Sequence, residues 1–149
     1  MTNTIIWHQL PNESPENRID RLNALLHRIF FDGKDVCPER FLLEDDEGKV
    51  WCSLCHEHPF KHGTPRFLES LDAMELIVTS GRFAEVREEF YHWLSKEGKP
   101  AYECTIPLYG REHDRARFTE KGYSRQEAFY LTALKSQGCS VVVEGQGEQ

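Results

Sequence analysis

Six possible metal ligands of this 149-residue chain lie between positions 37 and 62: Cys37, Cys52, Cys55, His56, His58 and His62. Proteins bind zinc through thiolate sulfur and imidazole nitrogen, usually with four ligands in a tetrahedron at about 2.0–2.3 Å. Two cysteines separated by two residues reach one ion through a tight turn, and Cys52 and Cys55 have this spacing. The pattern therefore predicts a zinc site in this part of the chain.

A β-hairpin is predicted around the two cysteines. The apolar segments 41–43 and 50–51 flank residues 45–48, a polar run that ends in the glycine typical of hairpin turns. If residues 46–48 form the loop, Asp45 faces Lys49 across the hairpin. The same register continues along both strands and pairs position 37 with position 57.

The predicted register brings Cys37 to the other cysteines. A loop longer by one residue moves its partner by only one position, so Cys37 lies beside Cys55 and His56 in either register. Pro38 ends regular pairing there, which a strand end tolerates. Three thiols and up to three imidazoles then meet at one end of the hairpin.

The choice of the fourth ligand depends on chain geometry. His56 follows Cys55 directly and would have to double back, so His58 is preferred, with His62 as the reserve. A complete zinc ribbon has two CxxC pairs, whereas Cys37 has no second cysteine near it in the sequence. A metal-free hairpin with three partly buried thiols is therefore an alternative interpretation of the same pattern. The predicted metal ligands are three thiolates and one imidazole: Cys37, Cys52, Cys55 and His58.

Two other kinds of chemistry fit the same segment. Residues 52–56 spell C-x-x-C-H, the attachment pattern of c-type haem, which requires export from the cytoplasm. Residues 51–55 match the W-C-x-x-C of thioredoxin-like dithiols, whose first cysteine sits at a helix N-terminus. Residues 1–17 lack the positive charge of a secretory signal, and Pro59 and Pro65 delay any helix. Both alternatives are therefore weaker than zinc.

Composition indicates one domain, and we expect a cytoplasmic location. The length suits a single domain over residues 1–143 with a tail over 144–149. Five cysteines cannot all pair, and clustered cysteines in a reducing compartment favour metal or redox chemistry. No apolar run approaches the roughly 18 residues that a membrane-spanning helix needs.

Hydrophobic periodicity predicts an α+β fold, with a mixed sheet of about five short strands and about four helices packed against it. Ser14 and Pro15 begin one helix, and Ser124 with Glu127 forms a capping box for another, which should be the most buried. Besides the hairpin, the predicted elements are strands over 5–10, 102–108 and 140–143 and helices over 15–31, 65–80, 83–97 and 125–137.

A basic stretch between positions 111 and 125 is the main argument for a nucleic-acid partner: Arg111, Arg115, Arg117, Lys121 and Arg125. Glu112, Asp114 and Glu120 lie among these residues, and the whole chain carries a formal charge of −7. Because nucleic-acid binding depends on neutralising phosphates, the sequence disfavours it. Isolated Cys104 is interpreted as a small buried side chain instead of a nucleophile.

The sequence thus predicts a zinc-stabilised binding or regulatory module that acts through protein partners. No phosphate loop, nucleophile elbow or spaced acid pair is present in the sequence. The alternative is an enzyme, either a thiol oxidoreductase that uses the CxxC pair or a hydrolase with an open zinc site.

Overall fold

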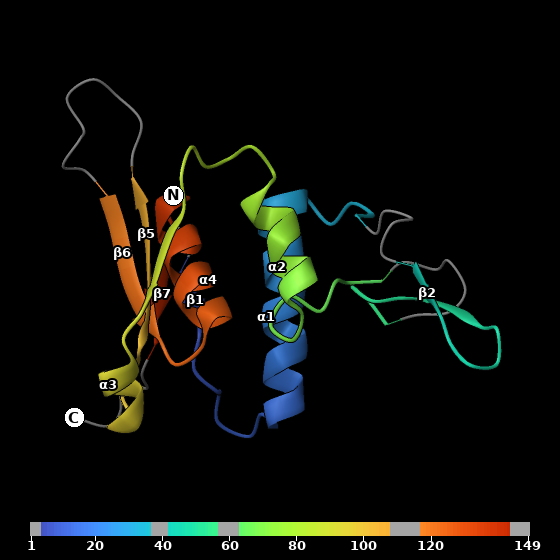
Figure 1. The fold of residues 1–149 in the computed structure, drawn as a ribbon, viewed down its shortest axis with the longest axis horizontal. Helices are drawn as coiled ribbons and strands as arrows, with labels where there is room; N and C mark the ends of the chain where they lie inside the picture. The colour runs from blue at the N-terminus through green and yellow to red at the C-terminus, as the bar shows by residue number, and fades with distance from the viewer. Residues whose placement is uncertain (1–3, 37–41, 57–62, 108–116, 144–149) are drawn as a thin grey trace. The chain divides into compact units, whose positions relative to one another are not determined.

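The computed structural model describes residues 4–36, 42–56, 63–107 and 117–143 (Figure 1). These residues form four helices and seven strands, which confirms the α+β class. The helices are α1 (Pro15–Phe31), α2 (Leu71–Val78), α3 (His92–Lys96) and α4 (Arg125–Ser136). The strands are β1 (Thr4–Ile6), β2 (Leu42–Glu44), β3 (Val50–Cys52), β4 (Arg87–Phe90), β5 (Tyr102–Pro107), β6 (Arg117–Gly122) and β7 (Ser140–Val142).

The chain divides into two compact units. Residues 1–10 and 78–149 form the sheet unit, and residues 11–77 form the hairpin unit. The sheet unit holds the parallel pair β1–β7 and the antiparallel sheet β4-β5-β6, while the hairpin unit holds the antiparallel pair β2–β3. The strands thus belong to three small sheets, where one mixed sheet was expected. No helix of the described residues is long and apolar enough to cross a membrane.

Helix α4 forms the core of the sheet unit. It packs against β5, β6 and β7 and lies along one face of the β4-β5-β6 sheet (Figure 1). Every residue from Ala128 to Leu134 is buried, as its nearly all-apolar circumference predicts. The polar Thr132 in this run has its hydroxyl 3.1 Å from the carbonyl oxygen of Cys104 and 2.8 Å from that of Ala128. The Thr132 hydroxyl therefore has hydrogen-bond partners inside the core.

The chain enters α4 through a capped turn. The Ser124 hydroxyl accepts a hydrogen bond from the Glu127 amide (3.1 Å), and the Glu127 carboxylate accepts one from the Tyr123 amide (2.9 Å). Gly122 ends β6 so close to the helix that a Cβ there would lie 2.6 Å from the Ala128 nitrogen. Only glycine fits at this position.

Helix α1 organises the hairpin unit. Ser14 caps it and Pro15 occupies its first turn, as predicted from the sequence. Asn23, which is 1% exposed, accepts a hydrogen bond from the Leu68 amide at 2.9 Å. Arg66 reaches Asp20 of α1 at 2.9 Å, and the Phe67 ring stacks on Phe31 at 6.1 Å between ring centroids. These contacts fix the segment 66–68 to α1.

Three elements differ from the sequence prediction. The helix predicted over 83–97 is wrong, because residues 87–90 form β4 and only residues 92–96 are helical. Pairing with β5 provides hydrogen-bond partners for the backbone of β4. This tertiary contact overrides the helical periodicity of the apolar residues. Strand β6 was not predicted. Helix α2 begins at Leu71 instead of Pro65, since Ser70 caps it by accepting a hydrogen bond from the Ala73 amide (3.2 Å).

We predict that Asn23→Ala lowers the free energy of unfolding by about 1–3 kcal/mol, because the Leu68 amide loses its acceptor inside the protein. Denaturant unfolding followed by circular dichroism measures the change. Asn17→Ala, the same substitution at an exposed position of α1, should cost much less. Equal losses in the two variants would contradict the structural role of Asn23.

Candidate metal centre at the Cys52–Cys55 turn

The register of the β2–β3 hairpin agrees with the sequence prediction. Leu42 pairs with Cys52, Leu43 with Trp51 and Glu44 with Val50. The Asp45 amide donates to the Lys49 carbonyl at 2.9 Å, so these two residues face each other across the turn as predicted. The loop therefore has three residues.

The side chain of Asp45 holds this turn together. One oxygen, Oδ1, accepts hydrogen bonds from the amides of Glu47 and Lys49, both at 2.9 Å. Gly48 adopts a φ of +81°, a left-handed conformation that is strained for residues with a side chain. The Gly48 amide donates to the Asp45 carbonyl at 3.0 Å. Local residues thus determine which strand positions meet.

The CxxC sequence forms a tight turn directly after β3. The His56 amide donates to the Cys52 carbonyl at 2.7 Å and closes the turn, with His56 itself at a φ of +59°. Inside the turn the Leu54 amide donates to Cys52 Sγ at 3.4 Å. Hydrogen bonds from outside the ligand set orient metal-binding side chains and tune the metal. The turn thus has a donor directed at one of the predicted zinc ligands.

The two thiols of this turn are buried. Cys52 is 0% exposed and Cys55 is 6% exposed, and Leu54 between them is also fully buried. Cys55 borders a cavity of about 320 Å³ that is lined also by Asp20, Asn23, Thr64 and Arg66. The Arg66 amide donates to the Leu54 carbonyl at 2.6 Å, which ties the turn to the segment held by α1.

The histidine that follows the turn packs its ring against a side chain of β3. The imidazole of His56 is exposed and lies edge-to-face against the Trp51 indole, with ring centroids 6.0 Å apart. The choice between His56 and His58 as the fourth ligand stays a prediction, because His58 lies outside the described residues.

The structure describes two of the four predicted ligands. Cys37, His58 and the reserve His62 lie outside the described residues. Cys52 and Cys55 lie together in the turn, and within the described part of the chain no group of three or more Cys, His, Asp or Glu side chains is placed to hold a metal ion. The complete four-ligand set stays a prediction.

The basic stretch of the sequence is not one surface within the described residues. Arg117 and Lys121 belong to β6, whereas Arg125 begins α4 and forms two hydrogen bonds with Glu88 of β4, at 2.9 and 2.8 Å. Arg111 and Arg115 lie outside the described residues. The structure therefore places Arg117 and Lys121 on one face of β6, whereas Arg125 is paired with Glu88.

A groove over the β4-β5-β6 sheet was not predicted from the sequence. It has a volume of about 710 Å³ and is lined by side chains of all three strands. Its lining residues on β6 are Arg117 and Thr119. These exposed residues alternate with the half-buried Phe118 and Glu120, which is the period of a strand and could have indicated this element.

Cys104 is fully buried on β5, which agrees with its predicted structural role. Burial raises the pKa of its thiol to about 12, so the thiol stays protonated and unreactive throughout the neutral range. We predict that iodoacetamide leaves Cys104 unmodified at pH 8 in the folded protein and modifies it readily in urea. Peptide mapping by mass spectrometry measures both. Equal rates in the two states would contradict this burial.

Comparison with protein-family models, with curated proteins and with solved structures finds no match for this chain. No relative therefore assigns a role to the Cys52–Cys55 turn. Its function has to be argued from the chemistry of the chain itself.

Proposed function

We propose that the hairpin unit is a zinc-stabilised module and that the protein acts by binding a protein partner, as an adaptor or regulator. The observation that supports zinc is the turn at Cys52 and Cys55, with two buried thiols and an amide directed at one sulfur. Zinc thiolate sites are built on such turns, and metal binding stabilises the fold that presents them.

Burial of the thiols supports a structural metal site over a redox dithiol. A working dithiol needs an accessible first sulfur, activated at a helix N-terminus or by a basic neighbour. Cys52 ends a β-strand and has no exposed surface, and among the described residues the next helix, α2, begins at Leu71. The oxidoreductase alternative therefore has less support.

Cys37 and His58 are the proposed remaining ligands. Leu42 pairs with Cys52 at the open end of the hairpin, so the segment before β2, which carries Cys37, and the segment after the CxxC turn, which carries His58, both connect to the hairpin at this end. Three thiolates and one imidazole complete a tetrahedron and leave no open position for a substrate. A closed site of this kind supports a binding role instead of a hydrolase.

The proposed site also implies a compartment. Zinc is bound by the thiolate form of cysteine, which an oxidising environment converts to disulfides. The four described cysteines are free thiols. We therefore propose that the protein works in the cytoplasm.

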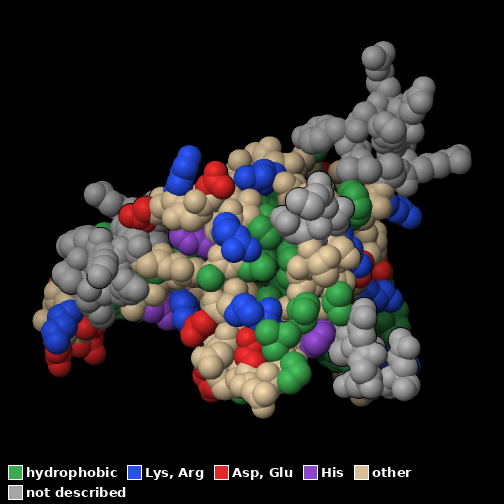
Figure 2. Space-filling view, turned by 180° about the vertical axis from the view of Figure 1, so that it is seen from behind, with side chains coloured by type: hydrophobic (Ala, Val, Ile, Leu, Met, Phe, Trp, Pro, Cys, Tyr) green, Lys and Arg blue, Asp and Glu red, His purple; other side chains and the backbone are tan. Residues whose placement is uncertain are grey.

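Exposed aromatic side chains of the sheet unit support a protein partner. Phe90 is 51% exposed, Trp93 is 54% exposed and Tyr123 is 67% exposed. Aromatic residues are enriched in protein interfaces and supply much of their binding energy. In the face drawn in Figure 2, basic and acidic side chains are interspersed, which together with the charge of −7 disfavours nucleic acid.

The zinc proposal predicts one zinc ion per chain in protein purified without added metal, measured by inductively coupled plasma mass spectrometry. Cys52→Ser and Cys55→Ser should each lose the metal and lower the melting temperature, because metal-binding free energy contributes to folding. Cys104→Ser removes a buried thiol outside the hairpin unit and should keep the full zinc content. Zinc-free wild-type protein that melts unchanged after zinc is added would contradict the proposal.

A further inference from the structure

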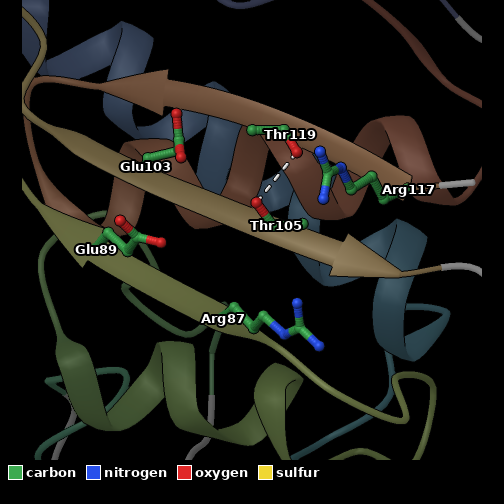
Figure 3. A pocket seen from close by; sticks show the side chains of 6 residues that line it. All are labelled: Arg87, Glu89, Glu103, Thr105, Arg117 and Thr119. Atoms are coloured by element: carbon green, nitrogen blue, oxygen red, sulfur yellow. Dashed lines mark hydrogen bonds between the residues drawn. The ribbon is translucent and has the colours of Figure 1, made fainter. Parts of the chain in front are cut away.

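The exposed face of the β4-β5-β6 sheet carries a polar groove that zinc binding does not use. Figure 3 shows two arginines toward one end, two glutamates toward the other, and a pair of threonines near the arginines. The groove belongs wholly to the sheet unit. Its lining side chains are Arg87, Glu89, Glu103, Thr105, Arg117 and Thr119.

Strand register produces the separation of charge. Arg87, Thr105 and Thr119 are paired neighbours on the three strands and form one row across the sheet. Glu89, Glu103 and Lys121 are paired neighbours in the next row on this face. Rows on one face of a sheet are two residues apart, about 7 Å. The groove therefore offers a basic and an acidic end at the spacing of a small molecule.

The basic end has two guanidinium groups that a ligand can engage. Arg117 forms no ion pair with any residue that the structure describes, and its side chain extends over Thr119 in Figure 3. Arg87 bonds Glu85 at 2.7 and 3.3 Å, and both of these side chains are largely exposed. Because exposed ion pairs are weak in water, an anionic ligand can replace Glu85.

The threonine pair adds a neutral donor between the two arginines. The hydroxyl oxygens of Thr105 and Thr119 lie 3.0 Å apart, so one hydroxyl donates to the other. Each hydroxyl has one hydrogen. The hydroxyl that accepts the bond can therefore donate its own hydrogen to another acceptor, such as a ligand oxygen. The basic end can therefore supply two guanidinium forks and one hydroxyl donor.

The charge of the acidic end is partly balanced inside the protein. The Tyr91 hydroxyl lies 2.8 Å from a Glu89 oxygen and 3.2 Å from a Glu103 oxygen, as a shared donor to both. Lys121 lies over the Tyr91 ring, with Nζ 5.4 Å from the ring centroid. Each carboxylate keeps further lone pairs for a cationic group. The acidic end thus holds two carboxylates, Glu89 and Glu103, against one ammonium group, Lys121, which leaves a net negative charge for an amine.

We infer that this groove binds a small phosphate monoester that also carries an amine, with the phosphoryl group between Arg87 and Arg117 and the amine toward Glu89 and Glu103. The two arginines come from strands two spacings apart, about 10 Å, and approach the threonine pair from different sides. A tetrahedral dianion presents oxygens to both guanidinium groups, whereas a planar carboxylate directs its two oxygens the same way. The charge of two arginines also favours a dianion over a monoanionic diester.

The inference is tested by calorimetric titration of the full chain with O-phosphoethanolamine, inorganic phosphate and ethanolamine. We expect O-phosphoethanolamine to bind most tightly, inorganic phosphate more weakly and ethanolamine not at all. Arg117→Gln should lower the affinity for O-phosphoethanolamine by about tenfold or more. Thr119→Val, which keeps the branched shape and removes the hydroxyl, should lower it several-fold.

The acidic end has its own variant. The double variant Glu89→Gln with Glu103→Gln should lower the affinity for O-phosphoethanolamine and raise the affinity for inorganic phosphate. The two affinities should then become equal. Lys99→Gln is the matched control, because it removes one positive charge from an exposed ion pair of the same unit outside the groove. It should leave the affinity unchanged, and circular dichroism checks the fold of every variant.

Three results would overturn the inference. The first is no saturable binding of either phosphate compound to the wild-type protein. The second is an equal loss of affinity in Arg117→Gln and Lys99→Gln, which would indicate general electrostatic attraction. The third is equal affinity for O-phosphoethanolamine and its glycerol diester, which would exclude the dianionic monoester. The groove residues and the proposed zinc ligands lie in different units, and zinc content and phosphate binding are measured separately, so each proposal can fail without the other.

Discussion

The hydrogen bonds of the Asp45 side chain are the constraint on which the proposed metal site depends. Oδ1 of Asp45 accepts from two amides of the turn and so fixes a three-residue loop with Gly48 in a left-handed conformation. A slip of one residue in a β-hairpin sends every side chain to the opposite face. The turn therefore determines where the chain leaves β3, and Cys52 and Cys55 follow directly from that end.

The elements that could be predicted from the sequence are the ones that local residues specify. The hairpin turn, the Ser14 cap and the buried helix α4 all agree with the prediction, because each depends on residues within a few positions of one another. Strand β4 could not be predicted in this way, and β6 is indicated only by the alternation of its side chains. Both are stabilised by pairing with β5, whose paired residues lie 10 or more positions away in the sequence.

The same distinction applies to the sites. The CxxC turn is local, so the spacing of its two cysteines is enough to indicate a possible metal site. The groove over the β4-β5-β6 sheet combines residues from three strands, among them Arg87 and Arg117, which no short motif connects. The periodicity of Phe83, Val86, Phe90 and Trp93 resembles that of a helix and conceals β4, although Arg87 pairs with Thr105 across the sheet.

The central claim is that Cys52 and Cys55 bind one zinc ion together with Cys37 and His58. X-ray absorption at the zinc edge, on the purified full chain, measures the elements bound to the metal and their distances directly. The account predicts three sulfur atoms at about 2.3 Å and one nitrogen at about 2.0–2.1 Å. A zinc shell of nitrogen and oxygen without sulfur would contradict it.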